Sequence, residues 1–194
     1  MEVGLEIAGL EAGGQRLDEI ALVLDGRLSE HRLTLDAAAP SGMPLSRAAL
    51  VLEGGLDQAR TRYAGQLSIL EVDAEQGELR LDGPALFTAD LEQGSARVQP
   101  FCLSRRQGGS LCLVEPMAAS AEGGEVTLRI EEVPMALLDP FLPEAWSAEG
   151  VTELDLDAGW GAGGSWRADG RLQSRLALDG QDAYGQPWSL PEAR

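Results

Sequence analysis

The two cysteines, Cys102 and Cys112, are the residues whose type and spacing suggest a specific chemistry. They stand at mirror positions about Gln107, in short apolar segments that flank a polar turn. If Leu103 pairs with Leu111 in an antiparallel hairpin, the cysteines oppose each other with Cβ atoms about 4.5–5.5 Å apart. That separation suits a disulfide, which predicts an oxidising compartment. Closing this short loop is worth about 2–3 kcal/mol on the loop-entropy model.

Free thiols or a redox pair are the alternatives to a structural disulfide. The spacing differs from Cys-x-x-Cys, and only Arg105 and Arg106 are close enough in sequence to lower a thiol pKa. The structural disulfide is therefore the favoured interpretation.

Two other groups of residues could carry chemistry. His31 is the only histidine, but no Gly-x-Ser-x-Gly or other nucleophile motif accompanies it, so an ordinary strand position is favoured over a catalytic base. Asp155 and Asp157 share a strand face and could form a calcium pair or a glycosidase dyad. Because Leu154 and Leu156 alternate with them, a solvated outer face is the simpler interpretation. We expect no catalytic residue, no metal site and no cofactor.

The composition excludes several classes of function. The 194 residues include 32 Asp and Glu against 15 Lys and Arg, a net charge of −17, and every one of the cations is arginine. Nucleic-acid binding needs clustered cations, so nucleic acid is not an expected partner. Without lysine, neither a Walker phosphate loop nor a Schiff-base enzyme is possible.

The first residues do not resemble a secretory signal, because Glu2 and Glu6 stand where a basic region is expected. No segment approaches the roughly 18 apolar residues that span a bilayer. The cysteine pair nevertheless suggests export. We expect this sequence to be an internal segment of a longer exported chain.

Apolar residues recur at every second position along most of the chain, the pattern of half-buried strands. Residues 124–131 are the clearest case, with Val126, Leu128 and Ile130 alternating with charged or polar residues. Asp25-Gly26, between two such segments, predicts a hairpin turn. Leu67 and Ile69 are expected to share a face. The sequence thus predicts an all-β domain over residues 1–180.

The helix predicted from the sequence is a single short one near residues 134–142. Pro134 favours a helix start, and Pro140 and Pro143 limit it to about two turns. Residues 181–194 are polar and contain proline, and we expect a frayed tail there. Aromatic residues are only 5% of the chain, too few for the core of a typical closed sandwich. An open, repetitive sheet is therefore favoured over a sandwich or a barrel.

Several motifs, taken in order, resemble those of the TamB family within the wider AsmA-like group. They are Tyr63-x-Gly65-x-Leu67-x-x-Leu70, the segment from Gly83-Pro84-Ala85, the paired segments Phe101-Cys102-Leu103 and Leu111-Cys112-Leu113, Val133-Pro134-Met135-x-x-Leu138 with Leu142-Pro143, and the strand start from Gly150 to Leu154. Each motif is degenerate alone, and the resemblance rests on their order over residues 20–180. Gly159-Trp160-Gly161 is less regular.

The resemblance implies a periplasmic protein anchored in the inner membrane by an N-terminal helix. Such proteins work with an outer-membrane barrel of the Omp85 type, TamA. Their elongated, curved β-sheet, an open solenoid called a β-taco, has a hydrophobic interior. It is thought to conduct phospholipids between the membranes or to assist assembly of outer-membrane proteins. The resemblance carries over no catalytic residue.

We therefore expect a non-enzymatic segment of a curved sheet whose hydrophobic groove holds phospholipid acyl chains. A scaffold that offers strand edges to folding outer-membrane proteins is the alternative, and a β-helical polysaccharide lyase is a third possibility. A purely structural core is the simplest explanation of the apolar positions. The residues expected to line the groove are Leu22, Leu24, Leu33, Leu35, Leu50, Leu52, Leu67, Ile69, Leu79, Leu81, Val126, Leu128, Ile130, Leu154, Leu156, Leu176 and Leu178.

Overall fold

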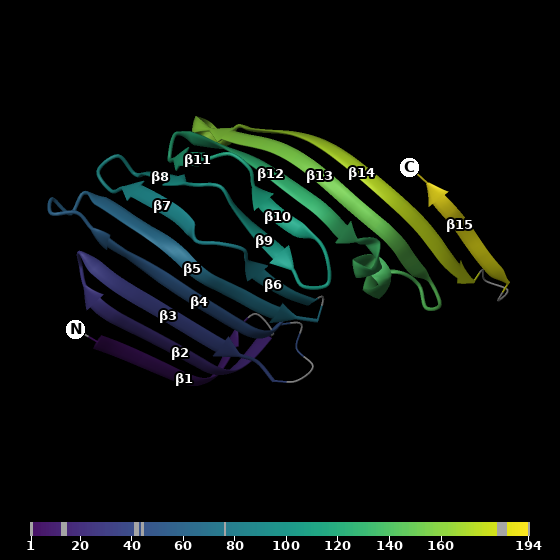
Figure 1. Ribbon diagram of the computed structural model, residues 1–194, viewed down its shortest axis with the longest axis horizontal. Helices are drawn as coiled ribbons and strands as arrows, with labels where there is room; N and C mark the ends of the chain where they lie inside the picture. Colours follow the sequence, from purple (N-terminus) through teal and green to yellow (C-terminus); the bar gives the residue numbers. More distant parts are fainter. Residues whose placement is uncertain are drawn as a thin grey trace.

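The computed structural model describes residues 2–12, 15–40, 43, 45–75, 77–181 and 186–193. These residues form one curved antiparallel sheet of 15 strands, shown in Figure 1. The all-β, curved-sheet prediction is confirmed. Five long strands open the sheet, each paired with the one before it: β1 (Glu2–Ala12), β2 (Gln15–Arg27), β3 (Glu30–Ala38), β4 (Leu45–Leu56) and β5 (Arg62–Ala74).

The middle of the sheet consists of six short strands laid end to end in pairs. They are β6 (Gly77–Leu81), β7 (Ala85–Asp90), β8 (Ser95–Val98), β9 (Phe101–Arg105), β10 (Ser110–Leu113) and β11 (Met117–Ser120). Strands β6 and β7 both pair with β5. Strand β9 pairs with β6 and β8 pairs with β7, and in the next position β10 pairs with β9 and β11 pairs with β8. The connectivity is thus a simple meander in which three successive strands are interrupted.

Each interruption contains a proline: Pro84, Pro100 and Pro116, spaced sixteen residues apart. Proline has no backbone N–H and cannot donate to a sheet ladder. Neighbouring amides keep the sheet joined at the gaps, since Gln99 N–H donates to Leu86 O at 2.8 Å and Val114 N–H to Thr127 O at 3.0 Å. The chain therefore bends within the sheet without leaving it.

Four longer strands close the sheet: β12 (Gly123–Pro134), β13 (Ser147–Gly161), β14 (Trp166–Gln181) and β15 (Pro187–Ala193). A 3-10 helix, η1 (Met135–Phe141), joins β12 to β13, and a short 3-10 turn, η2 (Ala162–Gly164), joins β13 to β14. The predicted short helix is confirmed in position. It is 3-10 rather than α-helical, as expected for a short segment with proline at both ends.

The predicted turn at Asp25-Gly26 is wrong. Gly26 pairs with His31 and Arg27 pairs with Glu30, so the chain turns at Leu28-Ser29. Leu22 and Leu24 of β2 lie opposite Leu35 and Leu33 of β3, and this pairing sets the register, which places the turn three residues later than the Asp-Gly signal.

The expected frayed tail contains a strand. In β15, Trp188 pairs with Gly180 and Leu190 with Leu178 of β14. The pairing of Leu190 with Leu178 and the contact between the Trp188 and Trp146 rings, whose centroids are 5.1 Å apart, thus outweigh the polar composition of this segment. Residues 182–185 and 194 of the expected tail lie outside the described residues.

Candidate functional site: an uncovered leucine face

The register places aliphatic side chains from successive strands on one side of the sheet, which we call the leucine face. One row across it begins at β2 with Leu22, Leu35, Leu50 and Leu70, and another crosses the second half through Leu81, Leu103, Leu111, Ile130, Leu154 and Leu172. Directly opposed residues share a face. All the residues expected to line the groove lie on this side, with one exception.

The exception is Ile69. Leu52 pairs with Leu67 while Val51 pairs with Ile69, so the register shifts by one residue at Ser68. This bulge turns Ile69 to the other side of the sheet and brings Leu70 to the leucine face. The prediction that Leu67 and Ile69 share a face is therefore wrong. No alternation in the sequence marks an extra residue of this kind.

The leucine face is not the interior of a two-layered core. Among the described residues, no second sheet packs on it, and only Val51, Ala85, Leu113 and Ala148 are buried hydrophobic residues. Most of the aliphatic side chains are half-buried by their neighbours on the same face. At the two ends of the sheet they are exposed, as at Leu5 and Leu172. A soluble domain of this length ordinarily buries its apolar face against a second layer.

Aromatic rings on this face cover glycines of neighbouring strands, an arrangement that sequence reasoning missed. A Cβ added at Gly54 would meet the hydroxyl oxygen of Tyr63, and one at Gly65 would meet the Phe87 ring. The Tyr63 and Phe87 rings stack with centroids 5.7 Å apart. Glycine leaves room for a flat ring against the backbone, and the ring shields that backbone from water. The signal in the sequence is a glycine two residues from an aromatic, as in Tyr63-x-Gly65.

His31 lies beside this cluster as a strand residue. The Tyr63 hydroxyl and His31 Nε2 are 3.0 Å apart, and His31 Nδ1 lies 3.2 Å from the carbonyl oxygen of Arg27. Both ring nitrogens therefore have partners. Burial raises the pKa of the Tyr63 hydroxyl, which keeps it neutral and able to hydrogen-bond here.

The opposite side of the sheet, the polar face, carries cross-strand ion pairs. Arg129 Nε lies 2.8 Å from Asp155 Oδ1 and Arg167 Nη2 lies 2.8 Å from Glu125 Oε1. The bond to Asp155 raises the pKa of Arg129. Arg32 pairs with Glu53 in the same way.

Hydrogen bonds also lower the pKa values of two carboxylates on the polar face. The Gln66 amide, and after it the Arg32 charge, lower the pKa of Glu53. Bonds from Arg106 and attraction by Arg80 lower the pKa of Glu78. Both groups are therefore charged at neutral pH, which keeps this face well hydrated.

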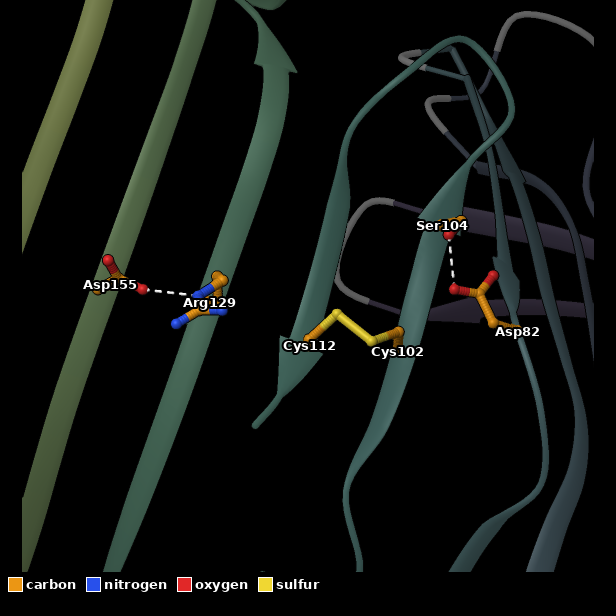
Figure 2. The surroundings of a disulfide bond; sticks show 6 residues. All are labelled: Asp82, Cys102, Ser104, Cys112, Arg129 and Asp155. Atoms are coloured by element: carbon orange, nitrogen blue, oxygen red, sulfur yellow. Dashed lines mark hydrogen bonds and ion pairs between the residues drawn. A yellow bond between two sulfur atoms is a disulfide. The ribbon is translucent and has the colours of Figure 1, made fainter. Parts of the chain in front are cut away.

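The disulfide between Cys102 and Cys112 is present and lies on the polar face. Leu103 pairs with Leu111 and Ser104 with Ser110, so the predicted register of this hairpin is confirmed. Figure 2 shows the sulfurs between the Ser104–Asp82 hydrogen bond and the Arg129–Asp155 pair. The disulfide thus joins two short strands without entering the leucine face.

The remaining candidate residues make ordinary contacts. Asp155 accepts from Arg129, and Asp157 accepts a 2.8 Å bond from the Thr127 hydroxyl. Within the part of the chain that the structure describes, no three His, Cys, Asp or Glu side chains gather as metal ligands would. No helix among the described residues has the length and hydrophobicity to cross a membrane.

The fold and the two faces define a class of protein: a single curved antiparallel sheet, apolar on one side and charged on the other. A family model described as the TamB N-terminal domain matches residues 1–184. The chain belongs to the TamB family, which acts in biogenesis of the bacterial cell envelope. No solved structure matches the chain.

Proposed function

We propose that the leucine face is a groove that holds phospholipid acyl chains, and that this chain is a non-catalytic part of a path between the inner and outer membranes. The observation that carries the proposal is an apolar face that crosses the sheet without a covering layer in the described residues. An exposed apolar surface of this extent marks a binding site in a soluble protein.

The mechanism is partition of the acyl chain between the bilayer and the groove. Burial of an acyl chain is worth about 0.8 kcal/mol per methylene, so a chain lying across several rows of leucines replaces most of what it loses on leaving a bilayer. The side chains that face it have no hydrogen-bonding groups along the row that runs through Leu113, Leu128 and Leu156. The phospholipid head group would stay in water at the open side of the groove.

The charges of the polar face support a periplasmic location away from membrane surfaces. With a net charge of −17, the chain is repelled by anionic lipid head groups. The disulfide fits the oxidising periplasm. We propose that the whole protein is anchored in the inner membrane.

A second candidate function is a scaffold for outer-membrane protein assembly with the Omp85-type partner TamA. The observation that favours it is that β1 pairs only with β2, and β15 only with β14, among the described residues. An edge strand with unpaired backbone groups can accept a strand from another protein.

The Leu128→Asp substitution tests the lipid proposal. Leu128 lies in the middle of the leucine face, paired with Leu113 and Leu156, and a carboxylate there would oppose an acyl chain. We expect loss of the phospholipid that native mass spectrometry detects on the purified chain, with the β-sheet signal in circular dichroism retained.

The matched control is Thr88→Asp. It adds the same charge at an exposed position of the polar face, in register with Arg97. We expect this variant to retain bound phospholipid. Equal lipid occupancy in the two variants would contradict the groove and favour the scaffold.

A further inference from the structure

The connection between β12 and β13 is far longer than a hairpin turn and returns across the sheet. Val133 and Pro134 of β12 pair with Thr152 and Val151 of β13. The chain between the two strands comprises η1 and the residues up to Trp146, and we call residues 135–146 the strap. Figure 1 shows η1 lying against β13 beside the end of β12.

Contacts at both ends of the strap place it over the leucine face of β14. At its start, Met135 Sδ lies 3.7 Å from the hydroxyl of Ser174, which follows Leu172 by two residues and shares its face. At its end, the Trp146 ring lies where a Cβ on Gly180 would be, and its Nε1 donates to Gln181 O at 3.0 Å. The strap therefore spans the segment from Ser174 to Gly180.

Burial along β14 increases beneath the strap, in the segment that also pairs with β15. Leu172, just before this segment and without a partner in β15 among the described residues, is 66% exposed, whereas Leu176 and Leu178 are half-buried. Ala148, which pairs with Leu178, is 1% exposed. The almost complete burial of Ala148, whose N–H bonds to Asp139 in the strap, shows that the strap covers this part of the leucine face.

One side-chain hydrogen bond ties the middle of the strap to the sheet. Asp139 Oδ1 accepts from the Ala148 N–H at 2.8 Å. Its backbone carbonyl also accepts from Leu142 N–H at 3.1 Å, which closes the last turn of η1. Asp139 is therefore the residue that holds this short helix on β13.

We propose that the strap marks the end of the acyl-chain site: it occupies the leucine face at residues 174–180, and bound lipid stops there. The inference rests on the proposed function, because it concerns where along the same groove a lipid tail can lie. The side chains that the strap covers, Leu176 and Leu178, are among those expected from the sequence to line the groove.

A phospholipid that carries a photoactivatable diazirine in its acyl chain tests this boundary without altering the chain. After irradiation, mass spectrometry maps the labelled residues. We expect label near Leu128 and Leu172 and background label at residues 176–180. Label at residues 176–180 equal to that near Leu128 would overturn the boundary and leave the groove intact. Absence of label on the whole leucine face would overturn the groove itself, and the boundary with it.

Asp139→Ala releases the strap in this test. We expect label at residues 176–180 to rise to about the level near Leu128, and amide exchange at Ala148 to accelerate about 2- to 10-fold, as loss of one hydrogen bond implies. Asp139→Asn keeps an acceptor oxygen, and Glu144→Ala removes an exposed acid from the strap; both should behave as the unaltered chain. Faster exchange at Ala148 in Asp139→Ala without new label would overturn the proposal that the strap limits lipid.

Discussion

The two faces of this sheet are built from alternate residues of the same strands, yet they are stabilised by different forces. On the leucine face, neighbouring side chains bury each other, and Leu113, for example, is only 5% exposed. On the polar face, pairs such as Arg129–Asp155 remain about half exposed, and solvent screening leaves such pairs little net effect on stability. The difference indicates that apolar contacts and the disulfide stabilise the sheet, while the ion pairs keep its outer face in water.

Truncation on the leucine face should have the largest effect on stability. Leu113→Ala removes a buried side chain where β10 ends, next to the interruption at Pro116, and should lower the free energy of unfolding by about 2–5 kcal/mol. Val114, its exposed neighbour, gives the matched control, Val114→Ala, with an expected change within about 0.5 kcal/mol. Urea denaturation measures both. Similar losses would show that the two sides do not differ in burial.

Removal of the disulfide should cause the second-largest loss of stability. Replacing both Cys102 and Cys112 by alanine should cost about 2–3 kcal/mol, because the unfolded chain gains the freedom of a ten-residue loop. The sulfurs lie on the polar face, so lipid labelling of the leucine face should not change. Thermal unfolding with and without reductant checks the first point, since reductant should affect only the unaltered chain. Loss of lipid label in the alanine variant would contradict this separation of the faces.

A glycine beneath an aromatic ring should tolerate substitution less well than an open one. In Gly124→Ala the new Cβ would overlap the Trp160 ring and lie 2.8 Å from the carbonyl oxygen of Ala118, an overpacking that costs about 1–3 kcal/mol. Gly4 has no atom within 4 Å of an added Cβ, so Gly4→Ala should be close to neutral. Denaturation midpoints compare the two, and equal midpoints would rule out tight ring packing on the leucine face.

Acid should have the smallest effect on stability, through three carboxylates whose pKa values are lowered in the folded chain. The folded pKa values of Glu53, Asp57 and Glu78 are lowered, chiefly by hydrogen bonds from Gln66, Arg62 and Arg106 respectively. Their stabilisation is complete above the ordinary carboxyl pKa of about 4 and is lost as pH falls through the lowered values. The melting temperature should therefore fall from pH 5 to pH 3.

Glu78→Gln tests the origin of this acid effect. The variant removes one titrating group, so its melting temperature should depend less on pH than that of the unaltered chain. Parallel curves would contradict a contribution from this carboxylate.

Much of the fold follows from local sequence pattern. The alternation of Val126, Leu128 and Ile130 was enough to predict a strand with one apolar side, because side chains in extended backbone alternate regardless of what pairs with them. The cysteine hairpin was predictable to the residue, since its pairing is symmetric about a short turn. Family membership was also evident from the order of motifs along the chain.

Other features depended on which strands meet. The turn at Leu28-Ser29 follows from the match of Leu22 and Leu24 with β3, which outweighed the Asp-Gly signal. The bulge at Ser68 lies where β5 pairs with β4 on one side and passes from β7 to β6 as its partner on the other. A one-residue insertion has no local sequence signature, although it reverses the side on which Ile69 lies.

The sequence by itself determined most of the strands, their apolar and charged sides away from the bulge at Ser68, and the pairing of the cysteines, because each depends on residues near in the chain. Tertiary structure decided that no second layer covers the leucine face in the described residues, and that residues 135–146 cover one corner of it. These outcomes depend on contacts between distant segments, such as Met135 with Ser174 and Trp146 with Gly180. Only the register and curvature of the whole sheet bring those segments together.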